Sequence, residues 1–313
     1  MVKFAFDYLE YSEYTEENME APGVHIPVMP DEVREGLNLS AGAVYVDGTT
    51  GCGGHARMIC SALKGDVRLI GIDRDRSSLD VARAQLADYQ DRVTLVHDDF
   101  RNIDRVLSGL AISQADGILL DVGISSFQLD NPERGFSHRS DGPLDMRMDQ
   151  ESFISAYDLI NSLSEREISL ILKNYGEERF HHRIAHFLVS RRPIQSTQEL
   201  SDIVLQAMPA RFHHQRIHPA TRTFQAFRIA VNRELEALEI ALDKAANLLK
   251  PGGRMCVISF HSLEDRIVKL KFRALARDGQ AELVTKKPLR PTEEEIQRNP
   301  RSRSARLRVL KKV

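Results

Sequence analysis

Carboxylates and glycines recur where the apolar segments of this chain end. The first apolar segment runs into Asp47-Gly48-Thr49-Thr50-Gly51-Cys52-Gly53-Gly54-His55. The second ends at Asp73, about 20 residues beyond the glycines, where an acid can accept hydrogen bonds from both hydroxyls of a ribose. Glycines let a backbone approach a ligand closely, and a helix that starts after them offers free N–H groups. These residue types predict an adenosine-type ligand.

Two further acidic positions extend the pattern. Asp98-Asp99-Phe100 follows the third apolar segment and offers an acceptor and an apolar face for adenine, and Asp121 ends the fourth segment. Ligands of open α/β sheets bind at the carboxyl ends of the strands, so these side chains should meet at one edge. Any one of these acids is more simply explained as a loop cap or a solvated turn residue. The whole set of strand-end acids favours a binding site.

The glycine loop does not by itself select the ligand. Gly51, Gly53 and Ala56 satisfy the dinucleotide fingerprint, and both NAD and S-adenosylmethionine carry a ribose. A carboxylate such as Asp47 would repel a pyrophosphate, whereas a sulfonium with an amino-acid tail would tolerate it. We favour S-adenosylmethionine, and we keep two rivals open, an NAD-dependent dehydrogenase and a nucleotide-sensing binding module without catalysis.

The elements that position these residues alternate between strands and helices, which is typical of βαβ units on a parallel sheet. The expected strands are 43–46, 67–72, 93–96 and 117–120, with helices at 56–63 and 77–86. After a long interruption, the pattern resumes with one helix at 223–249, a turn at 250–253 and strands at 255–260, 283–286 and 305–310. The sequence therefore predicts an α/β, doubly wound sheet.

The interruption divides the chain into domains. Residues 131–220 contain helical segments and no convincing strand, so we predict an inserted helical domain for substrate recognition. The flanking ranges 24–130 and 221–313 would form the ligand-binding domain. Residues 1–20 contain six acids and one lysine, and we predict that 1–23 form an acidic flexible tail.

Composition excludes little. The 313 residues are 42% hydrophobic and 28% charged with a net charge of −2, although beyond residue 20 basic residues outnumber acidic ones by three. The chain lacks an apolar run of about 18 residues that could span a bilayer. Its three cysteines, Cys52, Cys60 and Cys256, suit neither a disulfide framework nor a zinc site. We expect a cytoplasmic protein that does not enter a membrane.

Several longer strings resemble one family, the bacterial ribosomal RNA small subunit methyltransferase H family, also called MraW. The resemblance covers residues 24–312. The strings are His25-Ile26-Pro27-Val28, Asp47 to His55, Asp116 to Asp130, Glu133-Arg134-Gly135-Phe136-Ser137, Asp141 to Met148, Tyr175-Gly176-Glu177-Glu178-Arg179, His218 to Gln225 and Ser259 to Arg266.

The resemblance implies S-adenosylmethionine-dependent N4-methylation of a cytidine in the decoding region of 16S (small-subunit) ribosomal RNA. The substrate would be that RNA or the assembled small ribosomal subunit, and the fold a Rossmann-like class I methyltransferase sheet with an inserted all-helical domain. A methyltransferase acting on DNA or protein is the runner-up, and the sequence leaves a homodimer open. The donor-binding positions carried over are Gly53, Gly54, His55, Asp73, Phe100, Asp121 and Gln128. Phe127 stands where the family usually has proline, which leaves the backbone path beside the reactive centre open.

Methylation of the cytosine amine requires hydrogen-bond acceptors beside that amine. Its lone pair is delocalised into the ring, so catalysis needs acceptors for the amine hydrogens and alignment with the methyl group. Asp121, Ser125 and Ser126, after the fourth strand, are our candidate acceptors. The string His261 to Asp265 either shapes the same pocket or caps the next helix through Ser262 and Asp265.

Two other features are weaker. His182 and His186 have helical spacing, but without a third ligand we interpret them as surface histidines and predict no metal. The basic residues that we expect in part to contact RNA phosphates are Arg191, Arg192, Arg211, Arg216, Arg222, Arg298, Arg301, Arg303, Arg306 and Arg308. The C-terminal members could instead be the polar face of an edge strand. Phe127 and Phe212 are candidate stacking platforms for bases, or core residues.

Overall fold

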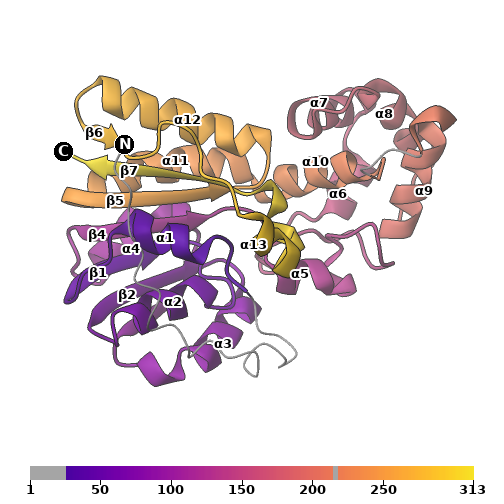
Figure 1. Ribbon diagram of the computed structural model, residues 1–313. Coiled ribbons are helices and arrows are strands. Elements are labelled where there is room, and N and C mark those ends of the chain that lie inside the picture. The colour runs from indigo at the N-terminus through magenta and orange to yellow at the C-terminus, as the bar shows by residue number, and fades with distance from the viewer. Residues whose placement is uncertain (1–25, 214–217) are drawn as a thin grey trace.

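A seven-stranded sheet forms the centre of the computed structural model, which describes residues 26–213 and 218–313 (Figure 1). The strand order is β3-β2-β1-β4-β5-β7-β6. The strands are β1 Ala43–Asp47, β2 Val67–Asp73, β3 Val93–His97, β4 Ala115–Asp121, β5 Leu249–Ser259, β6 Ala281–Leu283 and β7 Arg306–Lys312. The first five are parallel, and β7 is antiparallel to both neighbours. This is the expected doubly wound α/β sheet, with its switch point between β1 and β4.

Helices cover both faces of the sheet, so the central strands are apolar on both sides. In β4, Ile118 and Leu120 face one hydrophobic core and Leu119 faces the other, as the two-residue period of a strand requires. The first core is closed by α4 Ile103–Gly109, α11 Glu234–Leu248 and α12 Ser262–Arg277. The second is closed by α1 Pro30–Leu37, α2 Gly54–Ala62 and α3 Arg76–Gln85.

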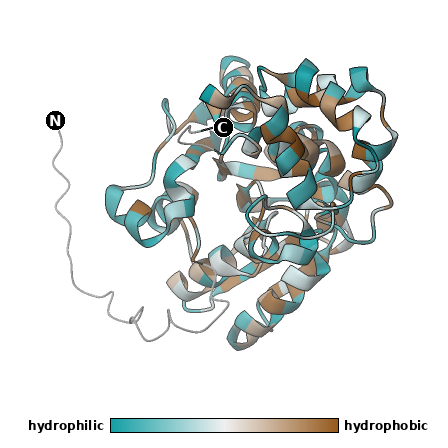
Figure 2. Ribbon diagram, turned by 90° about the vertical axis from the view of Figure 1, so that its right-hand side faces the viewer, coloured by the Kyte–Doolittle hydropathy of each residue, from teal (hydrophilic) through white to brown (hydrophobic). Residues whose placement is uncertain are grey.

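A third hydrophobic core lies in a separate group of helices beside the sheet. Those helices are α6 Ala156–Ser162, α7 Glu165–Gly176, α8 His181–Ser190, α9 Thr197–Ala207 and α10 Thr221–Asn232. Figure 2 looks onto this end, where the helices carry both hydrophilic and hydrophobic residues. Ser155 and Ser164 cap α6 and α7 in capping boxes, and Ser196 caps α9, so the sequence itself sets where these helices begin.

The prediction of one helix over 223–249 was wrong, because α10 and α11 are separated at Arg233, whose φ is 50°. Asn232 fixes the break: its Nδ2 donates to the Met146 carbonyl at 2.7 Å, and its Oδ1 accepts from the Met148 N–H at 2.8 Å. The buried side chains of α10 belong to the helical core rather than to the sheet. We therefore propose that the inserted domain extends to Arg233 instead of ending at residue 220.

The C-terminal part departs from expectation in details. The predicted turn at 250–253 is a bulge within β5, since Leu249 pairs with Ala115 and Arg254 with Gly117. The strand expected at 283–286 ends at Leu283. Two short elements, α13 Glu293–Arg298 and the 3-10 helix η6 Pro300–Ser304, precede β7.

The predicted acidic tail, His25 and Arg216 lie outside the described residues. Within the part that the structure describes, no helix is both long and apolar enough to cross a membrane.

Candidate functional site

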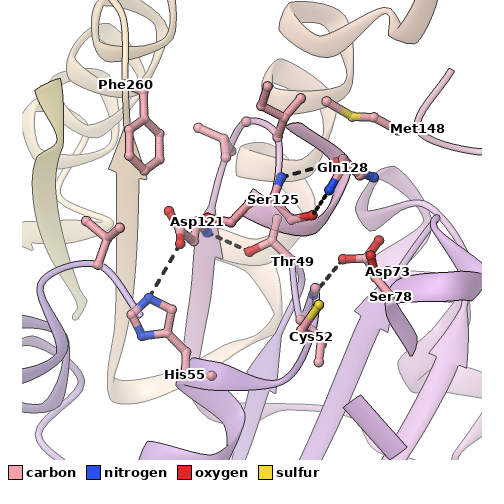
Figure 3. Close-up of a pocket in the computed structure, with 18 of the residues that line it drawn as sticks. Thr49, Cys52, His55, Asp73, Ser78, Asp121, Ser125, Gln128, Met148 and Phe260 are labelled. Carbon is pink, nitrogen blue, oxygen red and sulfur yellow. Dashed lines mark hydrogen bonds and ion pairs between the residues drawn. The ribbon is translucent and has the colours of Figure 1, made fainter. Parts of the chain in front are cut away.

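A pocket opens at the carboxyl ends of β1, β2 and β4, where the sequence placed its acids (Figure 3). Its wall includes residues 48–52 and 54–55 of the glycine loop, residues 73–74, and residues 121–126 after β4. Gly53 does not line the pocket. Its φ of 94° suits glycine, and a Cβ there would lie 3.3 Å from Ala82 of α3, so Gly53 lets the loop pack closely on that helix.

Asp73 ties the glycine loop to β2. Its Oδ2 accepts a hydrogen bond from the Gly51 N–H at 2.7 Å, and its Oδ1 accepts one from the Asp75 N–H at 2.8 Å. Burial raises the pKa of Asp73 from its usual value. Each carboxylate oxygen has a second lone pair, so the side chain can still accept from the hydroxyls of a ribose.

Asp121 faces the pocket between the glycine loop and β4. The Asp121 N–H donates to Thr49 Oγ1 at 2.6 Å, and Asp121 Oδ2 lies 3.5 Å from His55 Nε2 (Figure 3). Among the described residues, Asp121 Oδ1 and both ring nitrogens of His55 are buried without a hydrogen-bond partner. Unsatisfied buried polar groups cost free energy, so this set suits a ligand that carries both donors and acceptors.

The charge of the pocket favours a cation. Its wall contains four carboxylates against two guanidinium groups, those of Arg74 and Arg301. The four are Asp73, Asp121, Glu234 and Glu264. A fifth acid, Asp47, lies fully buried behind the wall, and burial raises its pKa to about 6. A pyrophosphate would be repelled here, whereas a positively charged ligand would be attracted.

Phe100 lines the pocket, as predicted, but its two acidic neighbours do not. Asp98 accepts hydrogen bonds from Asn102 Nδ2 at 2.7 Å and Arg105 Nη2 at 3.0 Å. Burial alone would raise the pKa of Asp98, but these hydrogen bonds lower it overall. Asp99 caps the turn at Arg101. Neither acid lines the pocket in this structure, and both are bonded to neighbouring residues, so adenine contact by Asp98 or Asp99 stays a prediction.

The two candidate serines lie side by side in the loop after β4 but differ in their hydrogen bonds. Ser125 is the N-cap of α5 Ser126–Asp130: its Oγ accepts from the Gln128 N–H at 3.2 Å, and its own N–H donates to Gln128 Oε1. Ser126 lines the pocket, and its hydroxyl has no hydrogen bond to the residues that the structure describes. Phe127 remains 38% exposed on α5. Ser126 is therefore the freer of the two hydroxyls.

A buried ion pair behind this loop was not predicted. Asp75 Oδ2 accepts from Gln128 Nε2 and from Arg134 Nη1, both at 2.7 Å. Arg134 Nη2 also donates to the carbonyls of Arg147 and Met148 at 2.9 Å, and Met148 lines the pocket. Burial raises the pKa of Asp75, but the bonds from Gln128 and Arg134 outweigh it and lower that pKa. The partners are 53 and 59 residues apart, so spacing could not reveal them.

The far wall comes from α11 and α12. Glu234 pairs through both oxygens with Arg228, at 2.9 Å each. Glu264 accepts from the Phe260 N–H at 2.8 Å and forms a capping box with His261, the N-cap of α12. The cap predicted from Ser262 and Asp265 was therefore placed one residue too late. Ser262 Oγ instead donates to Glu177, the C-cap of α7, at 2.7 Å.

The other candidates lie elsewhere. His182 contacts Ser169 and His186 pairs with Glu165, and no cluster of three or more metal-ligating side chains occurs among the described residues. In the C-terminal basic run, Arg306 and Arg308 bind Asp265, and Arg301 binds Asp130 at the pocket mouth. The edge-strand alternative was wrong, because β7 lies between β5 and β6.

Known proteins of similar sequence cover nearly the whole chain. A sequence profile described as the MraW methylase family matches residues 23–313. A protein of Clostridium botulinum (strain Kyoto / Type A2) named Ribosomal RNA small subunit methyltransferase H is 47% identical over 307 residues, covering 92% of this chain and 99% of its own length. A protein of the same name from Geobacter sp. (strain M21) is 49% identical over 307 residues, covering 92% and 98%.

Among solved structures, a putative rRNA methylase from Clostridium thermocellum aligns with a TM-score of 0.47 at 13% identity, over 93% of this chain and 100% of its own. The family assignment rests on the sequence matches, which span both the sheet domain and the helical insertion. The chain belongs to the MraW methylase family.

Proposed function

We propose that this protein transfers a methyl group from S-adenosylmethionine to N4 of a cytidine in the decoding region of 16S (small-subunit) ribosomal RNA, in the cytoplasm. The observation that carries the proposal is the acidic pocket at the switch point, whose buried polar atoms lack partners. Relatives named Ribosomal RNA small subunit methyltransferase H, at 47% and 49% identity, supply the substrate class.

The residues of the pocket fit the methyl donor. Asp73 would accept from the ribose hydroxyls, Phe100 would cover the adenine, and Asp121 would accept from the ammonium group of the amino-acid tail. His55 offers ring nitrogens to the donor's carboxylate, and the loop amide of Gly54 lies at the start of α2. When bound, S-adenosylmethionine supplies a methyl group made electrophilic by its sulfonium. Gly53 would act by shaping the glycine loop, whereas Gln128 lines the pocket and also holds Ser125 in the loop after β4.

The protein's own contribution to transfer is to accept a proton and to align the amine. Attack by the cytosine N4 lone pair forms the N–C bond while the C–S bond breaks, and the nitrogen then loses one proton. Asp121 and Ser126 carry free acceptor atoms beside the pocket, whereas the Ser125 oxygen already accepts from the Gln128 N–H. We therefore assign the amine contact to Asp121 or Ser126, with Ser125 as a positioning residue.

Labelled methyl transfer distinguishes this proposal from its rivals. The enzyme and labelled S-adenosylmethionine are incubated with small ribosomal subunits that lack the modification, and the RNA and protein fractions are separated. We expect label in the RNA, greatly reduced in Ser126→Ala and reduced less in Ser125→Ala after correction for folding. Label in ribosomal protein would overturn the RNA assignment. Donor binding without transfer to either fraction would favour the sensing module.

A further inference from the structure

The helical domain carries arginines without acidic partners. Residues 179–198 contain four arginines and three histidines but no aspartate or glutamate, and residues 203–233 likewise contain no acid. Four exposed arginines from these two stretches lie on α8, at its two ends and on the 3-10 helix η5 Ala210–Phe212, and we call them the arginine face. They are Arg179, Arg183, Arg191 and Arg211.

Each arginine of this face lies over a phenylalanine ring. The guanidinium carbon of Arg191 is 4.6 Å and that of Arg183 is 5.5 Å from the ring centre of Phe187. Residues 183, 187 and 191 follow the four-residue spacing of one helix face. A half-buried ring that anchors two guanidinium groups holds them in place at the surface, which lowers the entropy lost when they bind an anion.

The second half of the face joins α8 to η5. Arg179 lies 5.8 Å from the ring centre of Phe180, and Arg211 lies 5.1 Å from that of Phe212. The two rings contact each other edge to face, with their centres 5.0 Å apart. This contact brings the two arginines together although they are distant in sequence. Phe212 is therefore a support for Arg211 at this corner of the domain.

Some exposed arginines of the sheet domain are placed differently. On the sheet domain Arg83 pairs with Asp80 at 2.7 Å and Arg277 pairs with Asp278 at 3.0 Å. Within the described ranges, none of the four arginines of the face lies within ion-pair distance of a carboxylate. One exposed acid, Glu165 of α7, reaches α8, and it binds His186 at 3.2 Å. The face is thus a positive surface that no acid within residues 26–213 and 218–313 neutralises.

We propose that the arginine face binds the phosphate backbone of the ribosomal RNA substrate at a distance from the pocket; this rests on the proposed function. Planar guanidinium groups bind phosphate through paired N–H groups, and each contact releases counterions from the RNA. The face supplies binding energy to a large substrate without taking part in the chemistry. It also supplies a positive surface on a chain whose net charge is −2.

A matched pair of double variants tests the face. R183Q/R191Q removes two unpaired charges, and R83Q/R277Q removes two exposed charges that already have acidic partners. The affinity for protein-free small-subunit RNA is measured at several salt concentrations, together with KM and kcat on small subunits. Thermal melting of all variants checks the fold. R183K/R191K keeps the charge but loses the planar fork.

We expect R183Q/R191Q to weaken RNA binding about tenfold and to lower the slope of log affinity against log salt by about 1.5, at about 0.7 to 0.9 per lost phosphate contact. KM should rise while kcat stays unchanged, R83Q/R277Q should stay near wild type, and R183K/R191K should keep most of the salt slope. Equal affinities and slopes in both glutamine doubles would overturn the proposal.

The binding measurements on the arginine face can be distinguished from the methyl-transfer test of the proposed function. If the wild type methylates subunits and the glutamine doubles behave alike, only the arginine face fails. If the wild type transfers no methyl group but R183Q/R191Q still weakens RNA binding selectively, the face stands and the reaction fails. If the wild type neither binds the RNA nor methylates it, both are overturned.

Discussion

The pocket and the arginine face differ in the sign of their charged groups and in how those groups are surrounded. At the pocket, carboxylates are buried and held by internal partners, as Asp75 is by Gln128 and Arg134, while Asp121 keeps one oxygen free. On the arginine face, guanidinium groups are exposed, rest on phenylalanine rings and have no acidic partner among the described residues. A small cationic ligand requires the first arrangement and a long polyanion the second. One chain of nearly neutral net charge therefore carries two surfaces of opposite preference.

The largest expected effect comes from breaking the buried pair behind the pocket. Arg134→Met leaves Asp75 charged and buried, and we expect a loss of about 4 kcal/mol in the free energy of unfolding. Chemical denaturation measures it. R183Q/R191Q on the exposed face should change the same quantity by less than about 0.5 kcal/mol. A similar loss in both variants would contradict the contrast between the two regions.

Binding of S-adenosylmethionine should depend on Asp73 and not on Asp98. Asp73→Ala removes an acceptor for the ribose hydroxyls and the anchor of the Gly51 amide, which we expect to weaken S-adenosylmethionine binding by roughly a hundredfold, about 3 kcal/mol. Asp98→Ala, after the adjacent strand, should stay within about threefold because Asp98 does not line the pocket. Calorimetric titration gives both values. Comparable losses would restore Asp98 to the site.

Asp47 should make stability depend on pH. Its pKa is about 6 in the folded protein and lies near 4 when exposed, so the folded state holds the proton more tightly. Wild type should therefore lose stability relative to Asp47→Asn as pH rises from about 4 to about 6, by about 2 kcal/mol. Denaturation of both proteins across this range gives the difference. A difference independent of pH would show that Asp47 is not buried as a titrating acid.

The smallest expected effect concerns the cap of α12. His261→Ala removes the N-cap and should cost about 1 kcal/mol of stability. Ser262→Ala loses only the exposed bond to Glu177 and should cost less than about 0.5 kcal/mol. Thermal melting orders the two variants. The reverse order would return the cap to Ser262, where the sequence placed it.

Local signals predicted most of the sheet. β1 to β4 lie where the apolar runs lie, because a strand buried on both faces consists largely of consecutive apolar residues. The break between α10 and α11 was missed because neither proline nor glycine marks it. It depends on hydrogen bonds from Asn232 to residues 146 and 148, more than 80 positions away.

The candidate site was predictable in part for the same reason. Asp73, Phe100 and Asp121 follow strands, and topology alone brings them to one edge. Asp98 and Asp99 follow a strand too, but the choice between pocket and helix cap depends on side-chain contacts that a sequence does not display. Asp75 and Glu234 depend on partners in other elements and carried no signal, whereas Glu264 lies in the string from His261 to Asp265 that the sequence offered as a part of the pocket.

We propose above that the exocyclic amine of a cytidine in small-subunit ribosomal RNA receives the methyl group. The most direct measurement is mass analysis of nucleosides from subunits that lack the modification, after incubation with enzyme and labelled S-adenosylmethionine. We expect label in N4-methylcytidine, strongly reduced with Asp73→Ala. Label in a ring-methylated or ribose-methylated nucleoside, or none in RNA despite tight donor binding, would contradict it.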